Sequence, residues 1–164
     1  MNQETSKYAK ISLAFTALTG VLTSVHYFYE MGFKAVILVL LLLVLPVLMM
    51  RWLKKTGSKM ALRIYGLITT WLVIGFGFFD GFWNHVVKKF GYYYVLLPAH
   101  GGDKKVVEKT FSILPTEVGN FLFEATGILT FIMSIIAAYY LVKFIRVRKQ
   151  FITNIQNNIR GQYV

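Results

Sequence analysis

The sequence predicts an all-α integral membrane protein: a bundle of four transmembrane helices with a long outer loop between the third and fourth. The chain has 164 residues, of which 56% are hydrophobic and only 15% are charged. A soluble domain of this size carries more charge, about 25% of its residues. The most apolar stretches also reach the roughly 20 residues that a membrane-crossing helix needs. We therefore expect one transmembrane domain over residues 1–164.

Four stretches are long and apolar enough to cross a bilayer. They are expected at about 11–30, 35–52, 61–83 and 118–145, with the outer loop at about 84–117. Within the loop, the "HGGD" sequence at 100–103 predicts a turn between two strand-prone arms that end at Pro98 and Pro115. A loop of this length is unusual in so small a protein, so we interpret it as a lid over a site.

The basic residues predict the orientation of the bundle, because Lys and Arg resist translocation. Twelve of the 18 Lys and Arg residues lie on the side of the two termini: Lys7, Lys10, Arg51, Lys54, Lys55, Lys59, Arg63, Lys143, Arg146, Arg148, Lys149 and Arg160. Both termini of this multi-pass protein are therefore expected in the cytoplasm.

The formal charge of +11 does not indicate a nucleic-acid partner. The basic residues flank apolar spans instead of forming a soluble basic face, so the expected partner is the lipid bilayer. Assembly into a homo-oligomer or a larger membrane complex stays open. The chain has no cysteine, which excludes disulfides and thiolate metal sites.

Ionisable and amide residues gather near the predicted outer face of the membrane. They are His26 and Glu30 at the end of the first span, Asp80, Asn84 and His85 at the end of the third, and Glu117, Asn120 and Glu124 at the start of the fourth. Such side chains cost several kcal/mol each when they lie unpaired in hydrocarbon. We therefore expect them to face one another or a wet cavity inside the bundle.

Helical spacing indicates which of these residues face the interior. His26 and Glu30 continue a stripe of Ser and Thr residues that recurs at steps of three and four along the first span. Glu124 belongs to a similar stripe of small and polar residues in the fourth span. Ser, Thr, Gly and Ala let membrane helices pack closely, so part of each stripe is explained by packing alone.

The third span places Gly77, Asp80, Gly81 and Asn84 on one face. The G-x-x-x-G spacing of Gly77 and Gly81 predicts that another helix packs closely there. His85 follows Asp80 by five residues and would point about 140° away from it on a regular α-helix. We therefore expect His85 to face lipid headgroups.

These patterns predict a cation site with His26, Glu30, Asp80 and Glu124 as metal ligands. The residues expected in a second shell or a lid are Asn84, Asn120, Glu117, His85, His100 and Asp103. An imidazole combined with carboxylates suits Zn, Mn or Fe. The same side chains could instead exchange protons, as a proton-coupled transporter requires.

Three other functions remain open from the sequence. A membrane-embedded metal-dependent hydrolase acting on a lipid-like substrate would use a metal with an open coordination position and a spare carboxylate as base. A haem or quinone protein would use His26 and His85, with haem iron bound axially by both. A non-catalytic subunit would use the charged layer to dock a partner. The P-loop, G-x-S-x-G and H-E-x-x-H motifs are absent, so whether the chain is an enzyme stays open.

The predicted orientation can be tested by cysteine labelling, because the chain has no native cysteine. With single cysteines at Ser58 and Gly102, we expect an impermeant thiol reagent to label position 102 in intact cells. Position 58 should be labelled only after the membrane is permeabilised. Labelling of position 58 from outside intact cells would reverse the orientation and place the polar layer toward the cytoplasm.

Overall fold

The structure is a computed structural model that describes residues 2–111 and 121–161, without the side chains at 29, 30, 108–111, 122 and 155–161. The described part is all-helical, which confirms the predicted fold class. Four of its helices are long and apolar enough to cross a membrane: Gln3–Phe28, Phe33–Thr56, Lys59–Ala99 and Phe123–Asn154.

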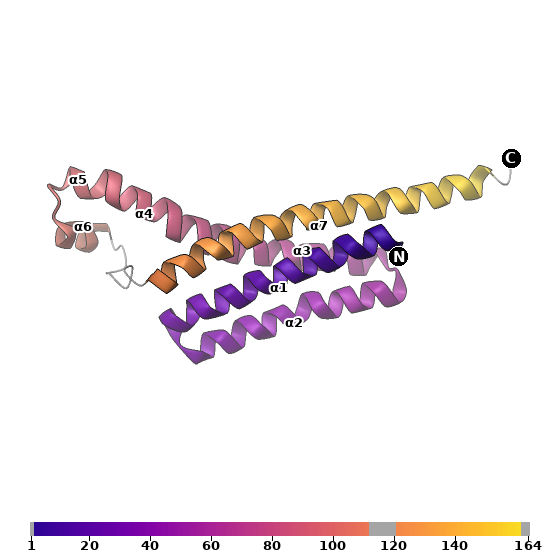
Figure 1. The fold of residues 1–164 in the computed structure, drawn as a ribbon, viewed down its shortest axis with the longest axis horizontal. Helices are drawn as coiled ribbons and strands as arrows, with labels where there is room; N and C mark the ends of the chain where they lie inside the picture. Colours follow the sequence, from indigo (N-terminus) through magenta and orange to yellow (C-terminus); the bar gives the residue numbers. More distant parts are fainter. Residues whose placement is uncertain (1, 112–120, 162–164) are drawn as a thin grey trace.

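The first two long helices form an antiparallel hairpin (Figure 1). α1 (Gln3–Met31) begins at Asn2, whose side chain accepts a hydrogen bond from the Thr5 amide, and α2 (Phe33–Thr56) follows after Gly32. Gly32 has a φ of 70°, a conformation that costs little only for glycine. A single residue is therefore enough to reverse the chain between the two helices.

The third long helix is one continuous rod made of several segments. α3 (Lys59–Leu72) runs into the π-helix η1 (Val73–Val87), and the rod continues through α4 (Lys88–Gly91), η2 (Tyr92–Leu96) and α5 (Leu97–Ala99). It spans 41 residues, about 60 Å at α-helical rise, which is twice the hydrocarbon thickness of a bilayer. Figure 1 shows α4 and α5 extending beyond the other helices.

The prediction that the outer loop contains two strand-prone arms is wrong. Residues 88–99 continue the rod, and α6 (Lys104–Phe111) stands where the second arm was expected. An isolated pair of strands is only marginally stable, whereas a helix satisfies its backbone groups internally. The predicted turn is confirmed, because Gly101 and Gly102 adopt φ angles of 64° and 83° between α5 and α6. Pro115 lies outside the described residues.

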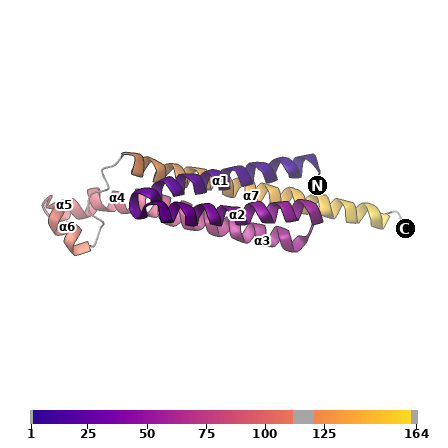
Figure 2. The same ribbon diagram turned by 90° about the horizontal axis from the view of Figure 1, so that it is seen from below.

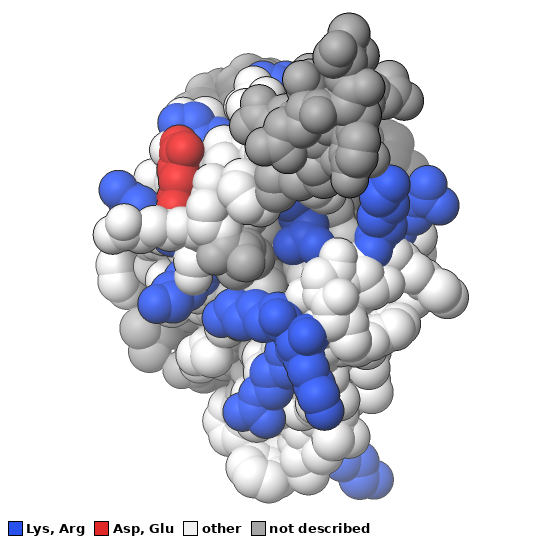
Figure 3. Space-filling view, turned by 90° about the vertical axis from the view of Figure 1, so that its right-hand side faces the viewer, with Lys and Arg blue, Asp and Glu red and all other residues white. Residues whose placement is uncertain are grey.

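The last helix, α7 (Phe121–Gly161), packs along α1 and η1 and extends past the bundle at the end that holds both termini (Figures 1 and 2). Lys and Arg side chains gather on this end, where acidic side chains are scarce (Figure 3). The end that holds both termini is thus rich in basic side chains, as the sequence predicted.

The interior of the bundle changes from apolar to polar along its axis. A cluster of buried apolar residues packs near the termini: Ala9, Met50, Leu53, Ala61, Tyr65, Leu141 and Phe144. Farther along, buried hydroxyl groups line the faces of α1 and α7: Ser12, Thr16, Thr19, Thr23, Thr126, Thr130 and Ser134. The hydroxyls of Thr16, Thr19 and Thr23 each donate to the carbonyl four residues earlier in α1. The polar half therefore leads from the apolar core toward the far end of the bundle.

The predicted close packing at the G-x-x-x-G spacing is confirmed, and the partner is α7. A Cβ atom built on Gly81 would lie 2.8 Å from the carbonyl oxygen of Gly127 and 2.9 Å from the amide nitrogen of Phe131. A Cβ atom on Gly77 would overlap the side chain of Ser134. Both glycines are therefore needed for η1 and α7 to approach this closely.

Gly81→Ala should destabilise the protein by about 1–3 kcal/mol, because backbone atoms of α7 occupy the space that the methyl group needs. Gly75→Ala is the matched control, since a Cβ atom there meets nothing within 4 Å. Thermal unfolding in detergent should show a lower Tm for Gly81→Ala and little change for Gly75→Ala. Equal melting temperatures for the two variants would contradict the close contact.

Candidate metal centre

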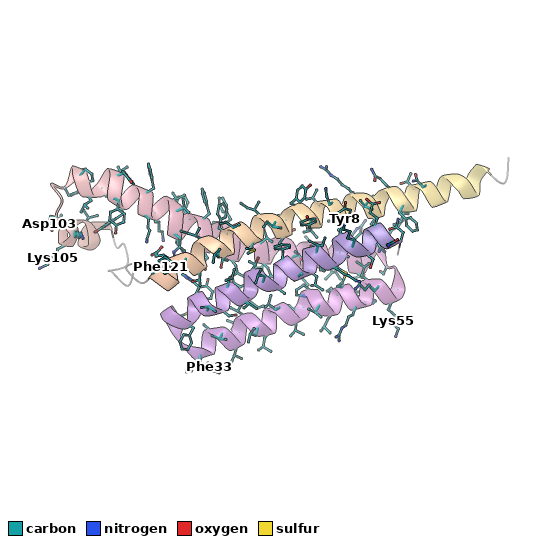
Figure 4. The ribbon with its side chains drawn as sticks, in the orientation of Figure 1. Tyr8, Phe33, Lys55, Asp103, Lys105 and Phe121 are labelled. Carbon is teal, nitrogen blue, oxygen red and sulfur yellow. The ribbon has the colours of Figure 1, made fainter. Side chains whose placement is uncertain are left out.

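Three buried residues from two helices form the centre of the polar layer. His26 comes from α1, and Asp80 and His85 come from η1; their exposed fractions are 1%, 6% and 5%. The site lies beside the beginning of α7, where Phe121 is labelled in Figure 4. One ligand atom from each of the three residues falls within 4.8 Å of the others, close enough to hold a metal ion.

The expectation that His85 faces lipid headgroups is wrong, because its side chain is buried against His26. The reason is the winding of η1. Backbone hydrogen bonds in a π-helix join residues five apart, which brings them to the same side of the helix. Asp80 and His85, five residues apart, therefore face the same site instead of diverging as they would on an α-helix.

The hydrogen bond of His26 determines which of its nitrogens faces the site. Nδ1 lies 3.2 Å from the backbone carbonyl oxygen of Phe123. A carbonyl only accepts, so Nδ1 carries the hydrogen and Nε2 of the neutral ring carries the lone pair. The ring also stacks on the side chain of Phe123, with centroids 4.1 Å apart. Its orientation is thus fixed by α7.

His85 is held in the same tautomer by a carboxylate. Its Nδ1 lies 3.0 Å from Oε2 of Glu124, which accepts the hydrogen bond. The other carboxylate oxygen, Oε1, lies 2.7 Å from Nζ of Lys89. Because Nδ1 carries the hydrogen, Nε2 of His85 also carries the lone pair in the neutral ring.

The two Nε2 atoms meet at the centre of the site. Nε2 of His26 and Nε2 of His85 are 3.2 Å apart, and the rings are nearly perpendicular at 86°. With both neutral rings in these tautomers, neither Nε2 can donate to the other. A cation, either a proton or a metal ion, between them or beside them would make the contact favourable.

Asp80 adds an acceptor to the same space. Its Oδ1 lies 3.7 Å from Nε2 of His26 and accepts a hydrogen bond of 3.2 Å from the Asn84 amide. Its Oδ2 is buried and has no hydrogen-bond partner among the described residues. A buried carboxylate oxygen without a partner is costly, unless it ligates an ion.

The spacing of these atoms fits a small divalent ion. Two nitrogen ligands at about 2.0–2.1 Å from a tetrahedral zinc ion lie about 3.3 Å from each other. The observed distances are 3.2 Å between the two Nε2 atoms and 3.7 Å from His26 Nε2 to Asp80 Oδ1. All three ligand atoms lie within 4.8 Å of one another.

Gly127 of α7 makes room for His85. A Cβ atom built on Gly127 would overlap the His85 ring. Gly127 belongs to the same stripe of small residues as Glu124, so α7 both holds the imidazole and leaves space for it. At Gly127, the small-residue stripe seen in the sequence therefore makes room for the His85 ring.

The other predicted site residues lie in different places. Glu124 contacts the outer nitrogen of His85 instead of joining the three converging ligands. His100 donates to the Leu96 carbonyl, and Asp103 accepts from the Lys105 amide at the start of α6. Figure 4 places Asp103 at the tip of the extended rod, far from Phe121. Glu117, Asn120 and the side chain of Glu30 lie outside the described part of the chain.

Two contacts of the site were not predicted from the sequence. Lys89 was counted only as one of the outer lysines, and the carbonyl of Phe123 carries no residue-type signal at all. Lys89 could have been found, because it lies one helical turn beyond His85 on the same rod. A backbone acceptor becomes visible only when the helices are placed in space.

Comparison with known proteins gives no match: neither a family model, nor a curated protein, nor a solved structure resembles this chain. The chemistry of the site therefore has to be argued from its own geometry.

Asp80→Asn should stabilise the metal-free protein by about 1 kcal/mol, because a neutral amide is less costly to bury than a carboxylate with an unpaired oxygen. The amide oxygen keeps the bond from Asn84. Asp103→Asn is the control, since this aspartate lies exposed at the start of α6. Thermal unfolding in the presence of a chelator should give a higher Tm only for Asp80→Asn. A lower Tm would mean that the carboxylate belongs to a satisfied structural network.

Proposed function

We propose that this chain is a membrane-embedded metal-binding protein. It holds a divalent cation on Nε2 of His26, Nε2 of His85 and the carboxylate of Asp80. The site lies near the end of the bundle that we expect to face outside the cytoplasm. A membrane interior favours such a group of ionisable side chains only where they bind one another or an ion.

The observation that carries the proposal is the 3.2 Å contact between the two Nε2 atoms. Each imidazole donates its Nδ1 hydrogen to an acceptor on α7, one a carbonyl and the other a carboxylate. Metal-binding histidines are usually held in this way, with the far nitrogen bonded to a carbonyl or carboxylate that fixes the tautomer and raises the basicity of the ligand. The partners of both rings thus support metal binding.

The set of ligands favours Zn, Mn or Fe. Two imidazoles and one carboxylate are the donors of catalytic zinc sites and of non-haem iron sites with open coordination positions. Ca²⁺ and Mg²⁺ prefer oxygen ligands throughout, and Cu(I) prefers sulfur. The proposed ion is therefore a divalent transition metal or zinc.

Glu124 serves the site without binding the ion directly. Its carboxylate lies at Nδ1 of His85, on the side of the ring opposite to the free Nε2. A metal ion on Nε2 would be too far from this carboxylate for a direct bond while the hydrogen bond is kept. The proposed role of Glu124 is to orient His85 and strengthen it as a ligand.

A bis-histidine haem is not supported by this geometry. Such a haem binds its two axial nitrogens on opposite faces of the macrocycle, at a separation of about 4 Å. The imidazoles of His26 and His85 touch each other directly, with no space for a porphyrin between them.

A metal-dependent hydrolase is the second candidate, because three protein ligands leave a fourth position open for water. Against it, Glu124 is engaged by Lys89 and His85 and so is a poor candidate for the general base. Hydrolysis of a fluorogenic ester or phospholipid in vesicles, lost in Asp80→Asn, would favour this candidate over binding alone.

The test of metal binding uses the purified full chain in detergent, stripped with a chelator and reloaded separately with Zn²⁺, Mn²⁺ or Fe²⁺. Elemental analysis should find a single ion per chain for at least one metal. His26→Gln, His85→Gln and Asp80→Asn should weaken binding by more than 100-fold, and Glu124→Gln by about 10–100-fold.

His100→Gln is the matched control, because it changes the third histidine of the chain at the tip of the rod and should leave the affinity unchanged. The proposal is wrong if the reloaded wild-type protein holds none of these metals. In that case a proton shared by the two imidazoles would account for their contact. A Soret band in the visible spectrum would restore the haem interpretation.

A further inference from the structure

A row of four side chains leads from the surface to the metal centre. The exposed fraction of the side chain falls from 27% at Lys89 to 14% at Glu124. It falls further to 3% at His85 and 1% at His26. Each side chain contacts the next, so this row marks one described route between the surface and the buried imidazoles.

Lys89 occupies the outer end of this route as a resident cation. Its ammonium lies 2.7 Å from Oε1 of Glu124, and the other oxygen of that carboxylate is engaged by His85. Glu124 is also more exposed than Asp80, whose side chain is 8% exposed. A cation that approaches along this row would therefore meet the Glu124 carboxylate before the imidazoles, and would find Lys89 already bound there.

We propose that Lys89 guards the entrance of the metal centre: an incoming divalent cation displaces its ammonium from Glu124 before it reaches the imidazoles. The inference rests on the proposed function of the site. The displaced ammonium moves into water, which a lysine with a partly exposed side chain does readily. The Glu124 carboxylate then attracts the cation toward His85 and resumes its bond to Nδ1 once the ion has passed.

This arrangement predicts an effect on the rate of loading that depends on the Lys89–Glu124 contact and not only on charge. Lys89→Met leaves Oε1 of Glu124 open and removes a positive charge from the route. Loading should become about 3–10-fold faster, because attraction of an ion into a charged entrance acts mainly on the association rate. Lys89→Arg keeps the charge and can hold the carboxylate through two hydrogen bonds, so loading should become slower than in the wild type.

Lys88→Met is the matched control. Lys88 is the preceding residue of the same rod, is exposed, and carries the same charge. Its replacement removes the same charge without opening Glu124, so loading should change less than twofold. Thermal unfolding of each variant checks that the bundle is intact.

The experiment is stopped-flow loading of the metal-free full chain with Co²⁺ or Zn²⁺ at two salt concentrations, with dissociation measured by a chelator chase. A faster association rate in Lys89→Met, a slower one in Lys89→Arg and a nearly unchanged one in Lys88→Met would support the proposal. Equal rates for the two methionine variants would overturn it, whether both are raised or both match the wild type. If the wild type binds metal and only these rates fail to respond, the metal centre stands and the entrance role is wrong. If the wild type binds no metal, the proposed function itself fails.

Discussion

The close approach of α7 to η1 is the constraint on which the rest of the site depends. Backbone atoms of α7 lie where a Cβ of Gly81 would be, and the His85 ring lies where a Cβ of Gly127 would be. α7 supplies the carbonyl that orients His26 and the carboxylate that orients His85. A separation wider by one methyl group would lengthen both hydrogen bonds, so the geometry of the imidazoles follows from helix packing.

The winding of η1 is the second requirement. π-helical turns are rare and occur frequently at functional sites, because they are less favourable than α-helical turns and persist where they are useful. In η1 the π-helical winding lets Asp80 and His85 bring their ligand atoms together. An α-helix would point two residues five apart in different directions. The two glycines at 77 and 81 bring α7 against this segment, so the unusual winding and the close packing occur together.

The sequence could predict the four helices and the depth of the polar layer, because the cost of burying charge in hydrocarbon forces His26, Asp80 and Glu124 to the interior. It could not predict that His85 faces the site, because the predicted direction of this side chain assumed α-helical geometry. Nor could it predict the helical rod after residue 88, because the aromatic and β-branched residues around Tyr92 favour strands when read locally. Strands without a partner strand would leave their backbone N–H and C=O groups without hydrogen bonds. A helix avoids this cost, and that outweighs the local preference of these residues for strands.

The contrast between the two polar regions of the bundle argues that the site is functional and not only structural. Along α1, the hydroxyls of Thr16, Thr19 and Thr23 each find an acceptor on their own helix. At the site, by contrast, the two Nε2 atoms lie 3.2 Å apart, and the buried Oδ2 of Asp80 has no hydrogen-bond partner among the described residues. Proteins retain such costly arrangements mainly where function requires them. A cation bound by the two Nε2 atoms and the Asp80 carboxylate would give this buried oxygen a partner, which supports the proposed metal binding.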